Sequence, residues 1–158
     1  MKKGRVVIVT AGRHSGKKAV IVKPNDEGRK EKKFAHALIV GIERAPHRVL
    51  RSMGKKKIER KMRLKPFVKF VNYNHLMPTR FLMKEDMEFK NIVTDEKMAS
   101  AETRKEMKTD LKAMLQDRYA KPETGEKQAI TDFLFSKLRF WVNSCLPFPL
   151  LLVVQYTV

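Results

Sequence analysis

Short runs of Val, Ile and Phe, separated by segments that contain Gly, Pro, Asn and Asp, crowd the first half of this chain. Runs of β-branched and aromatic residues with such boundaries predict strands. The runs are RVVIVT (5–10), AVIVK (19–23), FAHALIVGI (34–42) and FVKFVNY (67–73). Because closing a sheet of short strands removes its exposed edges, residues 1–81 are predicted to form a small antiparallel β-barrel.

The first two runs are joined by GRHSGKK (12–18), which resembles part of a phosphate-binding loop. A nucleotide P-loop reads G-x-x-x-x-G-K-[ST] and leads into a helix. Here the spacing from Gly12 to Gly16 is one residue short, Lys18 replaces the Mg-binding hydroxyl, and a strand run follows. The pattern therefore predicts a hairpin turn in which both glycines supply positive φ, and it argues against nucleotide hydrolysis.

Positive charge is concentrated in the same half of the chain. The 158 residues include 35 Lys and Arg against 17 Asp and Glu, a net charge of +18, and residues 1–80 alone hold 23 basic and 5 acidic residues. The whole excess thus belongs to the strand region, as expected where a protein lies against a polyanion. Nucleic acid is favoured over a membrane surface, because the basic residues alternate with strand runs and do not follow one amphipathic helix.

The densest positive charge lies in RAPHRVLRSMGKKKIERKMRLK (44–65), which has ten basic residues and only Glu59 as an acidic one. Such a run is usually solvated or disordered. Here strand runs anchor both of its ends. The segment is therefore predicted to be a long basic loop that inserts between phosphate backbones.

Beyond residue 81 the sequence becomes balanced in charge and helical in pattern. One face of a helix over residues 94–120 would collect the apolar residues Met107, Leu111, Met114, Leu115 and Tyr119. Asp95 and Glu96 suit its first turn, and Pro122 and Gly125 suit its end. With a second amphipathic piece at 129–140, residues 82–140 are predicted to be a helical arm, and the fold class is mainly β plus α.

Residues 141–158 form an apolar C-terminal extension, WVNSCLPFPLLLVVQYTV. Pro147 and Pro149 interrupt its apolar run, which is far shorter than the roughly 20 residues that span a bilayer. No membrane contact is therefore predicted. Two interpretations stay open, namely a strand that docks on a neighbour and a buried extension.

The reactive side chains form no pattern typical of catalysis or metal binding. The four histidines, His14, His36, His47 and His75, lie in separate segments without ligand spacing, and the single Cys145 has no neighbouring base. The apolar run near the N-terminus is too short for a secretion signal. The sequence predicts an intracellular protein that is not an enzyme and uses no metal, cofactor or small-molecule substrate.

Several segments together resemble one protein family. GRVVIVTAGRHSGKKAVIVK (4–23) resembles a KOW motif, the strand, turn and strand found in SH3-like barrels of ribosomal and transcription-elongation proteins. Later segments of the chain make the resemblance more specific. They are HALIVGIERAPHRV (36–49), MGKKKIERK (53–61), FVKFVNYNHLMPTRF (67–81) and FSKLRF (135–140). In this order they resemble the eukaryotic large-subunit ribosomal proteins numbered twenty-seven. Residues 141–158 depart from that family.

The resemblance implies an SH3-like barrel and a helical arm in a structural component of the large ribosomal subunit. Its partners would be ribosomal RNA and, through the arm and the extension, neighbouring ribosomal proteins. It would work in the cytosolic ribosome after assembly in the nucleolus. The alternative is a KOW-type module of a transcription or elongation factor that binds RNA or recruits proteins.

Carried over residue by residue, the resemblance implies RNA contacts in the hairpin turn, in the basic loop and in the polar segment NYNHLMPTR (72–80). The residues are Arg13, His14, Lys17 and Lys18; Arg44, Arg48, Arg51, Lys55, Lys56, Lys57, Arg60, Lys61, Arg63 and Lys65; and Asn72, Asn74, His75 and Arg80. For Asn72 and Asn74 an equal alternative is that their side chains form hydrogen bonds within a turn.

Overall fold

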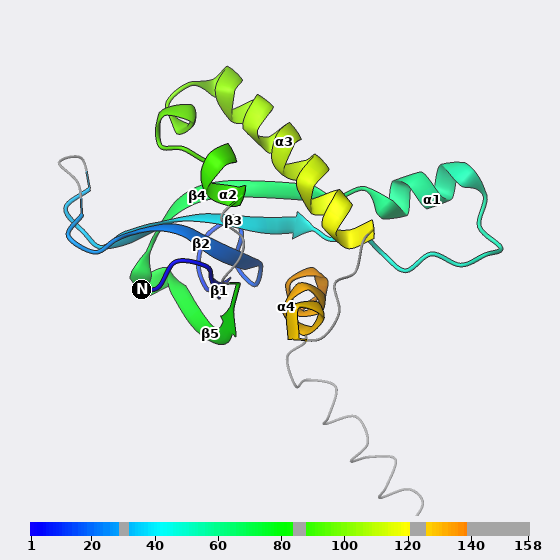
Figure 1. Cartoon of the computed structure of the whole chain (residues 1–158), viewed down its shortest axis with the longest axis horizontal. Helices are drawn as coiled ribbons and strands as arrows, with labels where there is room; N and C mark the ends of the chain where they lie inside the picture. Colours follow the sequence, from blue (N-terminus) through cyan, green and yellow to red (C-terminus); the bar gives the residue numbers. More distant parts are fainter. Residues whose placement is uncertain (29–31, 84–87, 121–125, 139–158) are drawn as a thin grey trace, which may run out of the picture.

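The computed structural model describes residues 1–28, 32–83, 88–120 and 126–138, so the apolar extension lies outside the described residues. The elements in order are β1 (Arg5–Val9), β2 (Lys18–Asn25), β3 (His36–Arg44), α1 (Lys55–Met62), β4 (Lys65–Asn72), the 3-10 helix η1 (Tyr73–His75), β5 (Leu76–Leu82), α2 (Glu88–Ile92), the 3-10 helix η2 (Glu96–Met98), α3 (Ala101–Ala120) and α4 (Glu126–Phe135). Figure 1 shows that α3 crosses the sheet while α1 projects beyond its end. None of the helices in the described ranges is long and apolar enough to cross a membrane.

The strands form one antiparallel sheet in the order β4-β3-β2-β1-β5. The four predicted strand runs are confirmed, each within a few residues. The fifth strand, β5, was missed, because Pro78 interrupts a segment that the sequence suggested was a polar RNA contact. Since β5 is an edge strand, the missing N–H of Pro78 is tolerated. Closure into a barrel is not shown, because the pairings of the described strands run in one line from β4 to β5.

The GRHSGKK segment is a hairpin turn between β1 and β2, as predicted. Gly12 and Gly16 have φ of 88° and 74°. Val9 N donates to Lys17 O at 2.9 Å, and Gly16 N donates to Val9 O at 2.7 Å. The turn leads directly into β2, whereas a nucleotide P-loop leads into a helix whose N-terminus faces the phosphates.

The basic segment is anchored at both ends, as predicted, but it is not all loop. Arg44 lies opposite Lys65 where β3 and β4 meet, and His47 N donates to Lys61 O at 2.9 Å. Between these anchors lies α1, with no buried residue. Its Lys, Arg, Glu and Met residues favour a helix once the ends are held, and the charge run concealed this preference.

Helix α3 begins at Ala101, later than the first turn expected at Asp95 and Glu96. Residues 96–98 instead form η2, and Asp95 Oδ2 accepts a hydrogen bond of 2.6 Å from Lys23 Nζ on β2. The predicted apolar face is confirmed for Met107, Leu111 and Leu115, which are buried. Met114 packs beside them, and Tyr119 is 37 % exposed, with its ring edge to face with that of Phe135.

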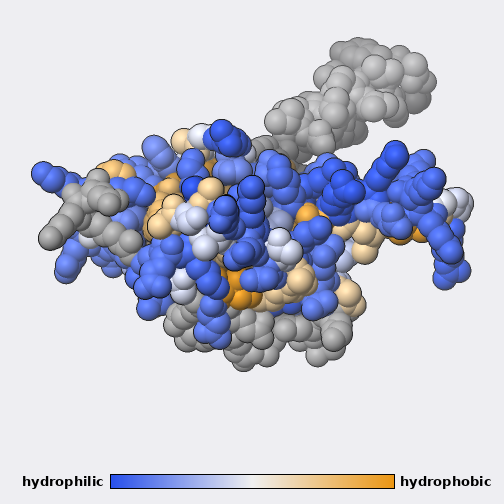
Figure 2. Space-filling view, turned by 90° about the horizontal axis from the view of Figure 1, so that it is seen from above, coloured by the Kyte–Doolittle hydropathy of each residue, from blue (hydrophilic) through white to orange (hydrophobic). Residues whose placement is uncertain are grey.

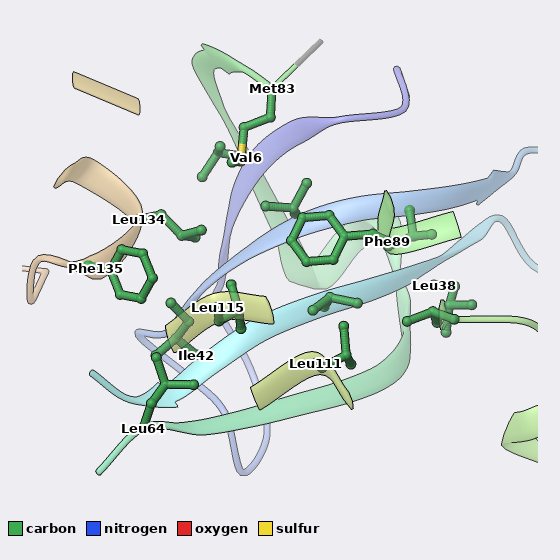
Figure 3. Close-up of a cluster of buried hydrophobic side chains, with 14 of the residues drawn as sticks. Val6, Leu38, Ile42, Leu64, Met83, Phe89, Leu111, Leu115, Leu134 and Phe135 are labelled. Carbon is green, nitrogen blue, oxygen red and sulfur yellow. The ribbon is translucent and has the colours of Figure 1, made fainter. Parts of the chain in front are cut away.

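Both faces of the sheet bury apolar side chains. One face joins α2, α3 and α4 in a cluster that includes Val6, Leu38, Phe89, Leu111 and Leu134 (Figure 3). The other face has its own cluster; its members include Val7, Val9, Ile21, Ile39, Phe67, Val71 and Leu76. Alternation along each strand sends neighbouring residues to opposite clusters. The helices expected as an arm therefore help to form the core of the sheet.

Replacing Leu111 by Ala should lower the free energy of unfolding by about 2–5 kcal/mol, because Leu111 is 0 % exposed and the change leaves a cavity. Gln116, which lies exposed on the same helix, is the matched control, and its replacement by Ala should change stability by less than about 0.5 kcal/mol. Denaturant unfolding of the full-length protein measures both. Equal effects would contradict the packing of α3 on the sheet.

Candidate nucleic-acid interface

Two open hollows meet at the end of β3. The first, of about 1080 Å³, lies between the β1–β2 turn, the start of β4 and α3. The second, of about 1060 Å³, lies between the same turn, residues 42–48 and the end of α4. Glu43 and Arg44 line both hollows. The turn therefore separates two surfaces, with Arg13 on one side and Lys17 on the other.

The first hollow is strongly basic. Its basic lining residues are Arg13, Arg44, Arg63, Lys65, Lys69, Lys108 and Lys112. Glu43 is the single acidic residue among the described residues that line it, and Lys65 Nζ forms an ion pair with Glu43 Oε2 at 3.1 Å. The hydrogen bond from Lys65 holds the pKa of Glu43 below its usual value, so this carboxylate stays ionised. One negative charge among seven positive ones leaves a surface suited to a polyanion.

Two of these residues, Lys108 and Lys112, were not predicted from the sequence. They follow the buried Met107 and Leu111 by one position each, which places them together on the flank of α3 beside β4. Lysines four residues apart share one side of a helix, and that spacing was the available signal. Sequence analysis assigned this helix to packing alone. Lys69 of β4 was missed as well, because it lies inside a strand run.

His14 lies at the turn but packs against the sheet. Its ring stacks on that of Phe67, with centroids 4.0 Å apart and planes inclined by 3°. Gly41 makes room for this arrangement, because a Cβ there would overlap the Phe67 ring. Burial lowers the pKa of His14 from its ordinary value, so the ring is neutral near pH 7. His14 therefore positions the turn and adds no charge to the hollow.

Lys18 is a second predicted contact that the structure does not present to solvent. The residue is 5 % exposed. Its ammonium donates to Phe133 O at 2.7 Å, to Ser136 Oγ at 2.8 Å and to Ser136 O at 3.1 Å. It also lies 3.9 Å from the centroid of the Phe133 ring. These three acceptors use all three ammonium donors. Burial lowers the pKa of Lys18, and the residue joins β2 to the C-terminal end of α4.

Most basic residues of α1, namely Lys55, Lys56, Lys57 and Arg60, are exposed. Lys55, Lys56 and Lys57 form its first turn, which has no acidic residue, and Gly54 provides no side-chain cap. Positive charges at the positive end of a helix dipole are unfavourable unless an anion is near. Figure 2 shows the projecting end that carries α1 densely covered by hydrophilic side chains.

The remaining basic residues predicted to contact RNA lie in different parts of the structure. Arg48 lines the second hollow, while Arg51 and Arg60 are exposed in the segment around α1. Lys61, in the last turn of α1, is half-buried.

The polar segment 72–80 is also not one surface. Asn72 Oδ1 accepts a hydrogen bond of 3.0 Å from Asn74 N, so the turn bond considered for Asn72 is present. Asn74 and His75 are exposed beside it. Arg80 belongs to β5, at the other edge of the sheet, where its guanidinium lies 5.2 Å from the centroid of the Phe81 ring.

Comparison with known proteins shows a consistent likeness. The model of the Ribosomal L27e protein family matches residues 6–145, slightly beyond the end at residue 140 that the resemblance suggested. Large ribosomal subunit protein eL27 of Tetrahymena thermophila is 46 % identical over 141 residues, which cover 89 % of this chain and 97 % of that protein. Large ribosomal subunit protein eL27B of Saccharomyces cerevisiae is 45 % identical over 140 residues, with the same two shares. Large ribosomal subunit protein eL27 of Candida albicans has the same identity and coverage.

The neighbours Lys17 and Lys18 should respond differently to replacement by Ala. Lys18→Ala should lower the free energy of unfolding by about 1–3 kcal/mol, because it removes the hydrogen bonds that join β2 to the end of α4. Lys17→Ala should change it by less than about 0.5 kcal/mol and should weaken RNA binding instead. Chemical denaturation and RNA titration of the two full-length variants measure these effects. Equal losses of stability would show that the Lys18 contacts contribute little.

Proposed function

This chain belongs to the Ribosomal L27e protein family, and from that premise we propose how it is held in the large ribosomal subunit. The chain is a structural constituent of that subunit and not an enzyme. Ribosomal RNA occupies the first basic hollow and surrounds α1. Membership of this family favours the ribosomal function over a transcription or elongation module.

The observation that carries this proposal is the convergence of charge from separate elements on one hollow. The turn, β3, β4 and α3 each contribute a Lys or Arg to the first hollow. Lys and Arg that neutralise phosphates release counterions, and Arg adds forked hydrogen bonds to phosphate oxygens. The sheet holds these cations at fixed positions, so an RNA backbone can be bound with little reorganisation.

Helix α1 supports the same proposal because its own contacts do not account for its stability. A helix of eight residues with no buried side chain is too short to persist in water. Phosphates near Lys55, Lys56 and Lys57 would neutralise the repulsion in its first turn and interact well with the helix dipole. We therefore assign α1 to insertion between phosphate backbones, with the β3 and β4 anchors fixing its direction.

The other contacts follow from the geometry. Lys17, Arg48 and the exposed cations around α1 extend the RNA surface from the first hollow to the second. Asn74, His75 and Arg80 remain proposed polar contacts, while His14, Lys18 and Asn72 position the segments that carry the charges.

The wider setting belongs to the same proposal. Residues 1–81 form an SH3-like unit, and burial on both faces of its sheet supports closure of the barrel. Residues 82–140 and the extension at 141–158 meet neighbouring ribosomal proteins. The protein works in the cytosolic ribosome and joins it in the nucleolus.

Charge reversal at Lys55, Lys56 and Lys57 to Glu should weaken binding to a fragment of large-subunit ribosomal RNA and flatten its salt dependence. If about 8 phosphates are neutralised, the logarithm of affinity falls with the logarithm of salt at a slope of roughly −6 to −7, and losing three contacts makes the slope shallower by about 2 to 3. Fluorescence anisotropy across a salt series measures both quantities.

The matched control reverses three exposed or half-buried cations outside the hollows, Lys97, Arg104 and Lys105, so that the change in net charge is identical. The control should retain most of the wild-type slope. If both triple variants lose affinity equally, α1 has no special role. A wild-type slope near zero would contradict the electrostatic proposal as a whole.

In a cell lysate at high salt, the tagged full-length protein should sediment with large ribosomal subunits. The triple variant at 55–57 should leave the subunits at a lower salt concentration, because fewer phosphate contacts hold it. Gradient sedimentation followed by immunoblotting measures the distribution. Recovery of the wild-type protein only in light fractions, even at low salt, would refute its place in the subunit.

A further inference from the structure

A third and smaller hollow lies along the free edge of the sheet, next to β4. Its volume is about 370 Å³, and the turn, β4, η1 and the segment that leads into β3 surround it. His14 and Lys69 line both this hollow and the first basic one, so the two are neighbours. The basic surface assigned to RNA above therefore continues directly into this smaller site.

Ring side chains form much of the wall of this hollow. Its rings belong to Phe34, Phe67, Phe70, His14, His36 and His75. Phe67 is almost completely buried, whereas Phe34 is 47 % exposed. An exposed Phe ring offers an apolar face that water does not satisfy, and it suits a partner with a flat ring.

Phe34 is held in place although it is exposed. Asn25 Nδ2 donates to His36 Nε2 at 3.2 Å, which leaves Nδ1 to donate to Phe34 O at 2.9 Å. The His36 ring contacts the rings of Phe34 and Phe70 edge to face, at centroid distances of 5.8 Å each. The backbone of Phe34 is thus tied to a buried histidine, so its ring is available without much loss of conformational freedom on binding.

The charge around the hollow is positive. Lys32 Nζ lies 4.3 Å from the centroid of the Phe70 ring, and Lys69 is exposed on β4. Among the described residues that line the hollow, none is acidic. Two cations beside an aromatic wall are the elements that bind single-stranded nucleic acid, in which bases stack and phosphates pair with Lys.

We propose that this hollow binds one unpaired RNA base, which stacks on Phe34 while its flanking phosphates contact Lys32 and Lys69. The inference rests on the proposed function and adds to it a preference for unpaired RNA. A base within a duplex cannot expose its face to Phe34, so this site selects RNA that leaves its helix next to the first hollow. An apolar side chain of a neighbouring protein would make no use of the two lysines.

Phe34→Ala should weaken binding of the full-length protein to a short oligoadenylate by roughly 5- to 150-fold, the usual effect of losing one stacked base. Binding to a blunt-ended RNA duplex should change by less than about twofold, and the salt slope for both RNAs should stay the same, because no cation is lost. Anisotropy titrations with the two labelled RNAs measure this. Since Phe34 is half exposed, circular dichroism should show an unchanged fold.

Two variants sharpen the test. Phe34→Trp should restore affinity for oligoadenylate, and its added fluorescence should be quenched by the oligoadenylate but not by the duplex. Met77→Ala is the matched control, because Met77 is 59 % exposed on β5 and is not among the residues that line this hollow. It should leave both affinities unchanged. Equal binding of oligoadenylate by the wild-type protein and Phe34→Ala would overturn the base site.

The outcomes separate this inference from the proposed function. A steep salt slope without an effect of Phe34→Ala would refute the base site alone, whereas a flat slope would refute the electrostatic binding of RNA. In assembled large subunits, a photo-crosslinking residue at position 34 should join ribosomal RNA. Crosslinks only to a neighbouring protein would show that its side chain fills the hollow and would overturn the assignment.

Discussion

Burial of apolar side chains on both faces of one sheet determines where everything else in this protein can lie. Three helices cover one face and the second cluster fills the other, so charged residues are displaced to the ends and edges of the strands. The basic residues therefore gather where the β1–β2 turn, the start of β4 and α3 meet. Because helices cover one face of the sheet, the basic residues cannot form a stripe across that face, as they could on an exposed sheet.

The turn between β1 and β2 is held in place by two of its residues that pack against other elements. His14 stacks on Phe67, and Lys18 caps the C-terminal end of α4. Arg13 and Lys17 are neighbours of these anchors and point to different hollows. Of the four turn residues predicted to contact RNA, two hold the turn in place and two present positive charge. The likeness to a P-loop reflects glycine conformation and positive charge, while the strand that follows excludes the helix that a nucleotide needs.

Features encoded locally could be predicted from the sequence. Four strand runs, the positive φ of Gly12 and Gly16 and the apolar face of α3 depend on neighbours within a few residues, and the structure confirms them. The resemblance to a ribosomal family is confirmed as well. Features that depend on distant partners were missed. Pro78 concealed β5, the pairing of Lys18 with residues 133–136 could not be deduced without the fold, and Lys108 became a site residue only because α3 lies beside β4.

The distribution of charge links the stability of the fold to the binding of a polyanion. Residues 1–80 carry the whole net charge of +18, and only a few of these cations pair with carboxylates among the described residues. Mutual repulsion therefore opposes the compact state, most strongly in α1, which has no buried residue to offset it. Binding of a polyanion to the folded form alone removes this repulsion and stabilises the fold by mass action. In the proposed complex, relief of this repulsion would stabilise α1.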